Sequence, residues 1–187
     1  MIITAKHKLK DIPKILPLLA VSGQDLLKEC SKFDMPKTIQ GIEPMKHSKI
    51  TILQQSAIWD IKDNAELLNA YAEIFFGITK KHTTWLANCP IIDFYRFAFE
   101  VQQQSIRYAE ELSNIKVELT EAEKKAGYGE KDPNGLLNLV YAMANKKHVS
   151  MEVAWNYPLV EYIFTFQNDA KESNRQRKYN KIISETK

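Results

Sequence analysis

The chain has 187 residues, of which 44% are hydrophobic and 26% charged, a composition typical of one globular domain or two small ones. Its 26 basic and 23 acidic residues leave a net charge of only +3, which argues against general electrostatic binding to nucleic acid or membranes. The two cysteines, Cys30 and Cys89, lie far apart in apolar sequence and indicate neither a disulfide framework nor a zinc site. We expect buried free thiols in a reducing cytoplasm.

Residues 1–49 are expected to form an irregular amino-terminal segment, because its four prolines remove backbone donors and disfavour helix in the preceding residues. One short helix is predicted over residues 22–33, with Ser22 as its cap. The apolar run ILPLLAV follows several lysines, as in a signal peptide, but Lys14 and Pro17 interrupt it. The sequence also lacks the roughly 20 apolar residues in a row that a membrane span needs. We therefore expect a cytoplasmic protein without membrane contact.

Residues 50–112 read as an amino-terminal helical domain. The spacing of apolar residues predicts a helix from about Thr51, and a second helix that begins at Asp63. Asp63 and Glu66 stand three apart, as in a capping box. Pro90 is suited to the first turn of a third helix, in which Asp93 complements the helix dipole. The run IIDFYRFAFEV in that helix is apolar almost all round, so it is expected to be the most buried helix of this domain.

Residues 113–135 read as a linker. Apolar and polar residues alternate in IKVEL, as in a short strand. Thr120 and Glu123 can form the capping box of a small helix. Three glycines and a proline follow and break regular structure. We interpret the Gly-x-Gly within GYGEKDPNG as a hinge, since no hydrophobic strand precedes it and no phosphate-loop lysine follows.

Residues 136–187 read as a carboxy-terminal helical domain with a basic tail. A leucine-rich helix is predicted to end near Lys147, Ser150 can cap the short MEVAW helix, and Pro158 marks the start of a last helix. The expected fold class is therefore all-α, with two small helical subdomains joined by a Gly/Pro-containing linker. The core side of the last helix is expected to hold Leu159, Val160, Ile163, Phe164 and Phe166.

The sequence contains no recognisable catalytic or metal-binding pattern. The four histidines lack the spacing of metal ligands. The carboxylate pairs lie beside lysines or at helix ends, where solvation or capping explains them better than acid and base chemistry. No serine stands in a nucleophile elbow. We therefore expect that the protein is not an enzyme and that it binds no cofactor and no metal.

Two groups of residues are candidates for contacts with a partner. Aromatic residues such as Trp85 and Trp155 are either core residues or anchors for a partner. In the tail, Lys171, Arg175 and Lys178 line one side of a helix, either as a phosphate-contacting stripe or as a solvated helix end whose cations complement the dipole.

One family resemblance sharpens these alternatives. LTEAEKKAG at residues 119–127, the helix LLNLVYAMANKK, and MEVAWNYPLVEYIFTFQNDAKESNRQRKYNK at residues 151–181 together resemble the carboxy-terminal part of the tail assembly chaperones of long-tailed phages and prophages. ITILQQSAIWDI and PIIDFYRFAFEV resemble the amino-terminal domain of that family. The resemblance covers residues 50–181.

The resemblance implies a non-enzymatic helical protein in the cytoplasm of the bacterial host. Its partners would be the tape measure protein, which it coats, and the tail tube protein, which polymerises around that client. The client is expected to meet either the surface near Trp85, Phe94 and Phe97 or the face that bears Trp155 and Tyr157. Self-association is left open by the sequence.

The alternative is a virion structural or packaging accessory protein that contacts nucleic acid through Lys171, Arg175 and Lys178. It predicts affinity that falls steeply with salt. Nucleic acid is the less expected partner. An enzyme would need an unforeseen pocket.

Overall fold

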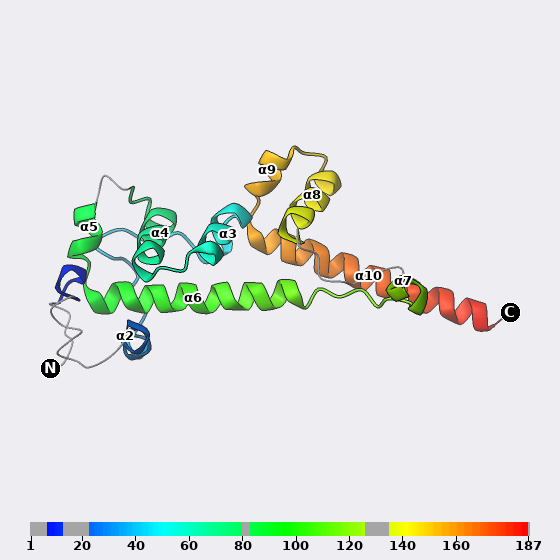
Figure 1. Cartoon of the computed structure of the whole chain (residues 1–187), viewed down its shortest axis with the longest axis horizontal. Coiled ribbons are helices and arrows are strands. Elements are labelled where there is room, and N and C mark those ends of the chain that lie inside the picture. The colour runs from blue at the N-terminus through cyan, green and yellow to red at the C-terminus, as the bar shows by residue number, and fades with distance from the viewer. Residues whose placement is uncertain (1–6, 13–22, 80–82, 126–134, 187) are drawn as a thin grey trace. The chain divides into compact units, whose positions relative to one another are not determined.

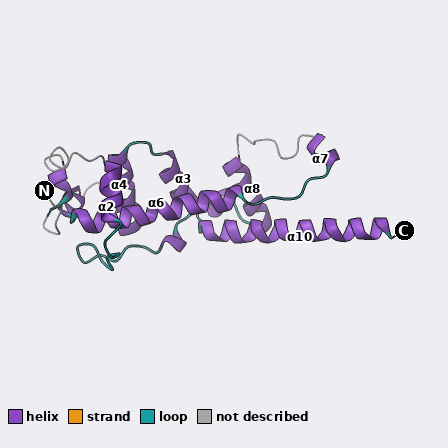
Figure 2. Cartoon of the chain, turned by 90° about the horizontal axis from the view of Figure 1, so that it is seen from below, coloured by secondary structure: helices purple, strands orange, loops and turns teal. Residues whose placement is uncertain are grey.

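The computed structural model describes residues 7–12, 23–79, 83–125 and 135–186 (Figure 1). Every regular element within these ranges is a helix (Figure 2), which confirms the all-helical prediction. Pairing between extended residues is limited there to isolated bridges, such as the one between Lys8 and Pro90. Ser22 and the predicted Gly-x-Gly hinge lie outside the described residues.

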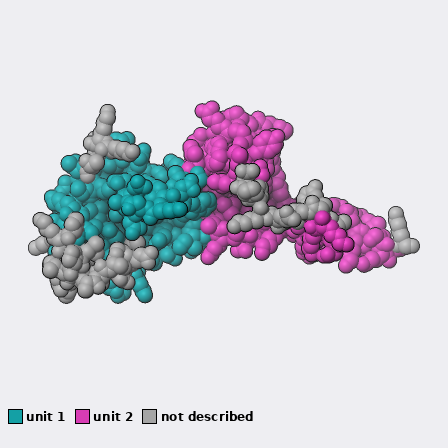
Figure 3. Space-filling view, viewed as in Figure 1, with its two compact units in different colours: residues 1–50, 54–107 teal, residues 51–53, 108–187 magenta. Residues whose placement is uncertain are grey.

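The chain divides into two compact units (Figure 3). Unit 1 comprises residues 1–50 and 54–107, and unit 2 comprises residues 51–53 and 108–187. The described part of the amino-terminal segment thus belongs to unit 1, and residues 113–125 of the predicted linker belong to unit 2. The division falls within one helix, at residues 107 and 108, so composition alone gave no signal of it.

Unit 1 is built mainly from helices α4 and α6. Its elements are η1 (Leu9–Asp11), α2 (Gly23–Cys30), η2 (His47–Lys49), the greater part of α3 (Ile52–Asp60), α4 (Asn64–Phe76), α5 (Thr83–Asn88) and α6 (Ile91–Ser113) as far as residue 107. The amino-terminal residues are held to the start of α6 by backbone hydrogen bonds. The N–H of Leu9 donates to the carbonyl of Cys89 at 2.9 Å, and the N–H of Ile91 donates to that of His7 at 2.9 Å.

Both ends of α4 follow from local sequence. The carboxylate of Asp63 accepts hydrogen bonds from the backbone N–H groups of Ala65 and Glu66 at 2.8 and 2.9 Å, so the predicted cap is confirmed. Gly77 ends the helix with φ 68°, a left-handed conformation that glycine adopts without a steric penalty. The chain turns away at this point, and Ile78 comes to line a pocket described below.

The first half of α6 is buried as expected. Ile91 and Phe94 are 0% exposed, Phe97 is 3% exposed and Val101 is 2% exposed. The two thiols are also buried: Cys30 is 1% exposed and Cys89 is 0% exposed, and both are free.

Unit 2 contains four helices in its described residues beyond the end of α6: α7 (Glu121–Lys125), α8 (Gly135–Lys147), α9 (Met151–Trp155) and α10 (Leu159–Glu185). Ser150 caps α9 by accepting a hydrogen bond from the N–H of Val153 at 3.3 Å, as predicted. The core of the unit includes Val140 and Met143 of α8 and Leu159 of α10, each 0% exposed.

The core side of α10 differs from the prediction in two residues. Phe164 is 68% exposed, whereas the unpredicted Tyr162 is fully buried and its hydroxyl donates to the carbonyl of Ala154 at 2.6 Å. Phe164 lies one residue beyond Ile163, about 100° further round the helix, and this rotation carries it off the buried side. Within the described residues no helix has both the length and the apolar character to cross a membrane.

Candidate partner-binding site

An aromatic cluster fills unit 1 and reaches its surface at Trp85. The rings of Phe76 and Trp85 are 5.1 Å apart, and those of Phe76 and Phe97 are 4.9 Å apart. Phe94 meets Trp85 edge-on at 6.4 Å between ring centroids. Such tilted and edge-to-face contacts stabilise aromatic pairs beyond the area they bury.

Two residues expected at the client surface lie inside this cluster. Phe94 and Phe97 are 0% and 3% exposed, so neither presents a surface to a partner in this structure. Phe94 packs against the partly exposed indole of Trp85, and Phe97 is linked to that indole through Phe76. The sequence predicted both a buried helix and a client surface near Phe94 and Phe97, because a helix that is apolar almost all round does not reveal which side faces solvent.

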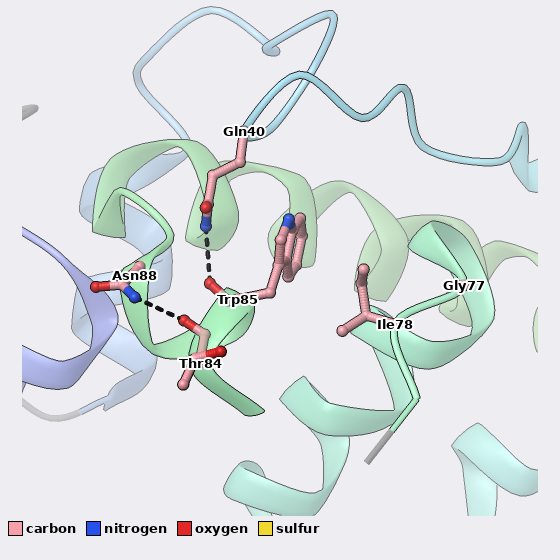
Figure 4. A pocket seen from close by; sticks show the side chains of 6 residues that line it. All are labelled: Gln40, Gly77, Ile78, Thr84, Trp85 and Asn88. Carbon is pink, nitrogen blue, oxygen red and sulfur yellow. Dashed lines mark hydrogen bonds between the residues drawn. The ribbon is translucent and has the colours of Figure 1, made fainter. Parts of the chain in front are cut away.

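A pocket of about 420 Å³ lies beside Trp85. It opens between the end of α4, helix α5 and the turn that holds Gln40 (Figure 4), and all of its lining belongs to unit 1. The indole stands between Gln40 on one side and Ile78 on the other. The wall combines apolar and polar groups, which is typical of a site that takes an apolar anchor and orients it with a few hydrogen bonds. Its lining residues are Gln40, Gly77, Ile78, Thr84, Trp85 and Asn88.

The turn at Gln40 is locked in place by its own backbone and by its side chain. Ile39 and Ile42 exchange backbone hydrogen bonds at 2.9 and 3.0 Å. Gln40 and Gly41 between them have φ of 50° and 78°, as in a type I′ turn. The Gln40 side chain donates to the carbonyl of Trp85 at 2.7 Å. This contact spans 45 residues of sequence, and nothing in the local pattern predicted it.

Helix α5, which carries Trp85, is fixed by two further hydrogen bonds. The side-chain amide of Asn88 donates to the carbonyl of Thr84 at 2.8 Å, and Lys10 donates to the Asn88 oxygen at 3.0 Å. The Trp85 indole Nε1 is buried and has no acceptor within the part of the chain that the structure describes. An unpaired buried donor of this kind typically costs about 1–3 kcal/mol. A rearrangement that brings a hydrogen-bond acceptor to the indole N–H of Trp85 is therefore favourable.

The second predicted contact face lies in unit 2. Trp155 ends α9 and Tyr157 follows it, and both side chains are partly exposed. The N–H of Ile52 donates to the carbonyl of Tyr157 at 3.1 Å, which holds this backbone against residues 51–53 of the same unit. The two residues are thus accessible in part.

The basic residues of α10 are largely paired with carboxylates of the same unit. Arg175 lies 3.8 Å from Glu172, and Lys178 lies 3.8 Å from Glu118. Both pairs are exposed and weak. They place carboxylates beside two of the three cations in the stripe of Lys171, Arg175 and Lys178.

Residues 114–125, here called the strap, are fastened to α10 by polar groups. The Asn174 side chain accepts from the N–H of Glu118 at 2.8 Å and donates to the carbonyl of Lys116 at 3.3 Å. The expected strand is thus extended backbone held by a side chain. The predicted capping box of α7 is confirmed, with the N–H of Thr120 donating to Glu123 at 2.8 Å and the reverse bond at 3.2 Å.

A bidentate ion pair completes this attachment. Arg177 donates to both Glu123 oxygens, at 2.7 and 2.9 Å. These hydrogen bonds, together with those from Thr120, lower the pKa of the Glu123 carboxyl to about 2. The Glu123 carboxylate therefore both caps α7 and anchors the strap to α10.

Burial favours the uncharged forms of three titratable groups in unit 1, namely Cys30, Cys89 and His47. Burial raises the pKa of both thiols to about 11, and a protonated thiol is a poor nucleophile. Burial lowers the pKa of His47 to about 4, although Glu100 and a hydrogen bond to Gln55 act in the opposite direction. Among the described residues no group of three or more potential ligand side chains could hold a metal ion.

Comparisons of this chain with models of protein families, with curated proteins and with solved structures found no match.

Proposed function

We propose that this chain is a non-enzymatic tail assembly chaperone of a long-tailed phage or prophage. Its clients would be the tape measure protein and the tail tube protein, met in the cytoplasm of the bacterial host. The order of elements along residues 119–185 supports this proposal most directly. A small capped helix, a leucine-rich helix, a short helix that ends before a proline, and a long charged helix follow one another, in the order that the family resemblance implies.

In this proposal the protein acts as a jointed body. The sequence indicates two helical subdomains, at residues 50–112 and 136–187, joined by the Gly/Pro-containing linker at 113–135, of which residues 113–125 belong to unit 2 in the structure. A long helical client needs several apolar contacts along its length rather than one deep site, and a jointed body can supply them.

The pocket beside Trp85 is the contact that we propose for the client. An apolar side chain of an amphipathic helix would enter between Trp85 and Ile78, and Gln40, Thr84 and Asn88 would contact polar groups at its rim. The partly exposed face with Trp155 and Tyr157 is the second contact. Support for the first comes from the pocket itself and from the rigid aromatic backing of the indole, because rigid anchors bind at a low entropic cost.

Co-expression with the tape measure protein tests the function. We expect the tape measure protein to become soluble and to co-purify with the chain. An insoluble tape measure protein that leaves no trace in the purified chain would contradict the proposal, and binding to DNA that weakens steeply with salt would then favour the nucleic-acid alternative.

Obstructing the pocket beside Trp85 tests whether the client binds there. Thr84 is an exposed lining residue, so Thr84→Arg obstructs the opening without disturbing the aromatic cluster. We expect at least about a tenfold loss of affinity for the tape measure protein, the effect of losing one anchor. The matched control is Gln103→Arg, at an exposed position of α6 in the same unit, and should bind normally. Equal binding by both variants would exclude the pocket as the contact.

A further inference from the structure

The pocket beside Trp85 has one wall that is held in place by a distant part of the chain. Helix α5 supplies that wall and has only six residues, fewer than an isolated helix needs to be stable in water. The position of Trp85 therefore depends on contacts between α5 and the rest of unit 1. The aromatic cluster supports the indole ring, and a separate contact holds the Trp85 backbone.

This backbone contact is made at the carbonyl of Trp85. The last carbonyls of a helix lack an N–H partner within the helix. The N–H of Cys89, which would donate to the Trp85 carbonyl in a continued α-helix, donates instead to the carbonyl of Leu86 at 3.0 Å. The side-chain amide of Gln40 takes its place and donates to the Trp85 carbonyl at 2.7 Å (Figure 4). Gln40 thus caps the carboxy-terminal end of α5 from 45 residues away.

The same amide group makes a second contact just beyond α5. Its nitrogen also donates to the sulfur of Cys89 at 3.0 Å, and that thiol donates to the Trp85 carbonyl at 3.5 Å. Two hydrogen bonds from one amide nitrogen engage both of its hydrogens. Any hydrogen bond between the Gln40 side chain and a client is therefore one that the client donates. The larger contribution of Gln40 to the site is the position that it gives to Trp85.

The turn that carries Gln40 favours a shorter residue at this position. Its base is fixed, because Ile39 is 0% exposed and exchanges backbone hydrogen bonds with Ile42. Gln40 and Gly41 have φ of 50° and 78°, and type I′ turns prefer Asn-Gly at these two positions. Residues held in such uncommon backbone conformations are concentrated at functional sites. Glutamine exceeds asparagine by one methylene, and this added length lets the amide reach the Trp85 carbonyl.

We propose that Gln40 is the positioning residue of the client site. It caps α5 and so keeps the indole of Trp85 opposite Ile78, where the apolar side chain of the client enters. This role rests on the chaperone function proposed above and acts through Trp85, in addition to any contact of Gln40 itself at the rim. A shift of the turn at residues 39–42 then also shifts the indole, so the turn and the pocket move together.

Two substitutions separate the hydrogen bonds of Gln40 from its place in the turn. Gln40→Asn suits the type I′ turn better than glutamine, so the variant should fold, but its amide is too short to reach the Trp85 carbonyl. Gln40→Glu keeps the length and loses both donor hydrogens at neutral pH. The matched control is Thr38→Asn, at an exposed position of the same segment, which leaves the hydrogen bonds to α5 in place.

Binding of the tape measure protein connects the position of Trp85 with function. We expect both Gln40 variants to bind it about tenfold less tightly than the wild type, and the Thr38 control to bind normally. Wild-type affinity in both Gln40 variants would overturn the role of Gln40 in client binding. A wild type that fails to bind would instead contradict the proposed function, and the client-free measurement that follows would still decide whether Gln40 positions Trp85.

The indole N–H signals in a ¹H–¹⁵N correlation spectrum measure the positioning without any client. The three tryptophans, Trp59, Trp85 and Trp155, give one signal each, and a Trp85→Phe variant assigns that of Trp85. We expect this signal alone to shift in both Gln40 variants and to stay in place in the Thr38 control. Backbone amides of α5 should exchange hydrogen about tenfold faster in the Gln40 variants, the effect of about one lost hydrogen bond. Wild-type signals and exchange in both variants would overturn the proposal, and so would equal shifts of all three indoles, which would mean that Gln40 supports the fold as a whole.

Discussion

The two units are stabilised in different ways. In unit 1, a cluster of aromatic rings lies between α4 and α6, and Phe94 and Phe97 are almost completely buried. In unit 2, the strap is attached to α10 by the Asn174 amide and the Arg177–Glu123 ion pair, and α10 keeps large apolar residues exposed. Burial of apolar area is insensitive to salt, whereas exposed ion pairs are screened. We therefore expect unit 1 to resist conditions that loosen parts of unit 2.

The largest effect is expected from removing a ring of the aromatic cluster. Phe97→Ala leaves a cavity next to Phe75 and Phe76, whose centroids lie 5.3 and 4.9 Å from that of Phe97. Such truncations typically cost about 3–5 kcal/mol. Urea denaturation followed by near-ultraviolet circular dichroism will measure the loss in unit 1. A cost below about 1 kcal/mol, the range of surface changes, would show that the cluster is not the main source of stability.

In unit 2 the matching test removes a smaller buried group, the hydroxyl of Tyr162. Tyr162→Phe removes the hydroxyl that donates to the carbonyl of Ala154 at 2.6 Å and leaves that carbonyl without this donor. We expect a loss of about 1–2 kcal/mol in the free energy of unfolding, measured by the same urea titration. Tyr179→Phe, which changes an exposed hydroxyl, is the matched control and should be neutral. A neutral Tyr162→Phe would show that this hydroxyl contributes nothing to the packing of α9 on α10.

Mild acid should destabilise unit 1 through His47. Its pKa is about 4 in the folded chain against about 6.5 when unfolded, so the unfolded state binds more protons between these values. Stability is fully present above pH 6.5 and falls as the pH drops from 6.5 toward 4, by about 1–2 kcal/mol between pH 7 and pH 5. Urea titrations at both pH values measure this slope. His47→Asn should flatten it, and an unchanged slope in that variant would assign the effect to other groups.

The smallest effect is expected at the strap. Arg177→Ala removes both hydrogen bonds to Glu123, while Thr120 still caps α7. Backbone amides of residues 118–125 should exchange hydrogen faster, with little change in overall unfolding, because the pair is solvent-accessible. Arg175→Ala, which affects only an exposed pair within α10, should leave the strap unchanged. Salt at about 1 M should accelerate the same amides in the wild type. Unchanged exchange in both cases would mean that apolar contacts hold the strap.

Much of the helix layout could be predicted because helix ends depend on local chemistry. Asp63, Ser150 and the Thr120–Glu123 pair cap helices as expected, since a cap joins groups only two or three residues apart. Pro158 likewise marks the start of α10. These signals are readable without knowledge of the packing.

The candidate site was harder to predict because it depends on contacts between distant segments. The Gln40 turn meets α5 through a hydrogen bond across 45 residues, and no sequence pattern signals such a partner. The sequence identified the aromatic residues but did not reveal which of them are exposed to solvent. Phe94 proved buried and Phe164 exposed, because residue type states how much surface a side chain can bury but not which way its helix faces. Helical spacing around Leu159 and Ile163 could have found Tyr162.

The most direct measurement of the proposed function is hydrogen exchange of this chain with and without the tape measure protein. We expect the bound client to slow exchange in the Gln40 turn, at Ile78 and along α5, around the pocket beside Trp85. Unchanged exchange throughout the chain, with the tape measure protein in excess, would contradict both the chaperone function and its location.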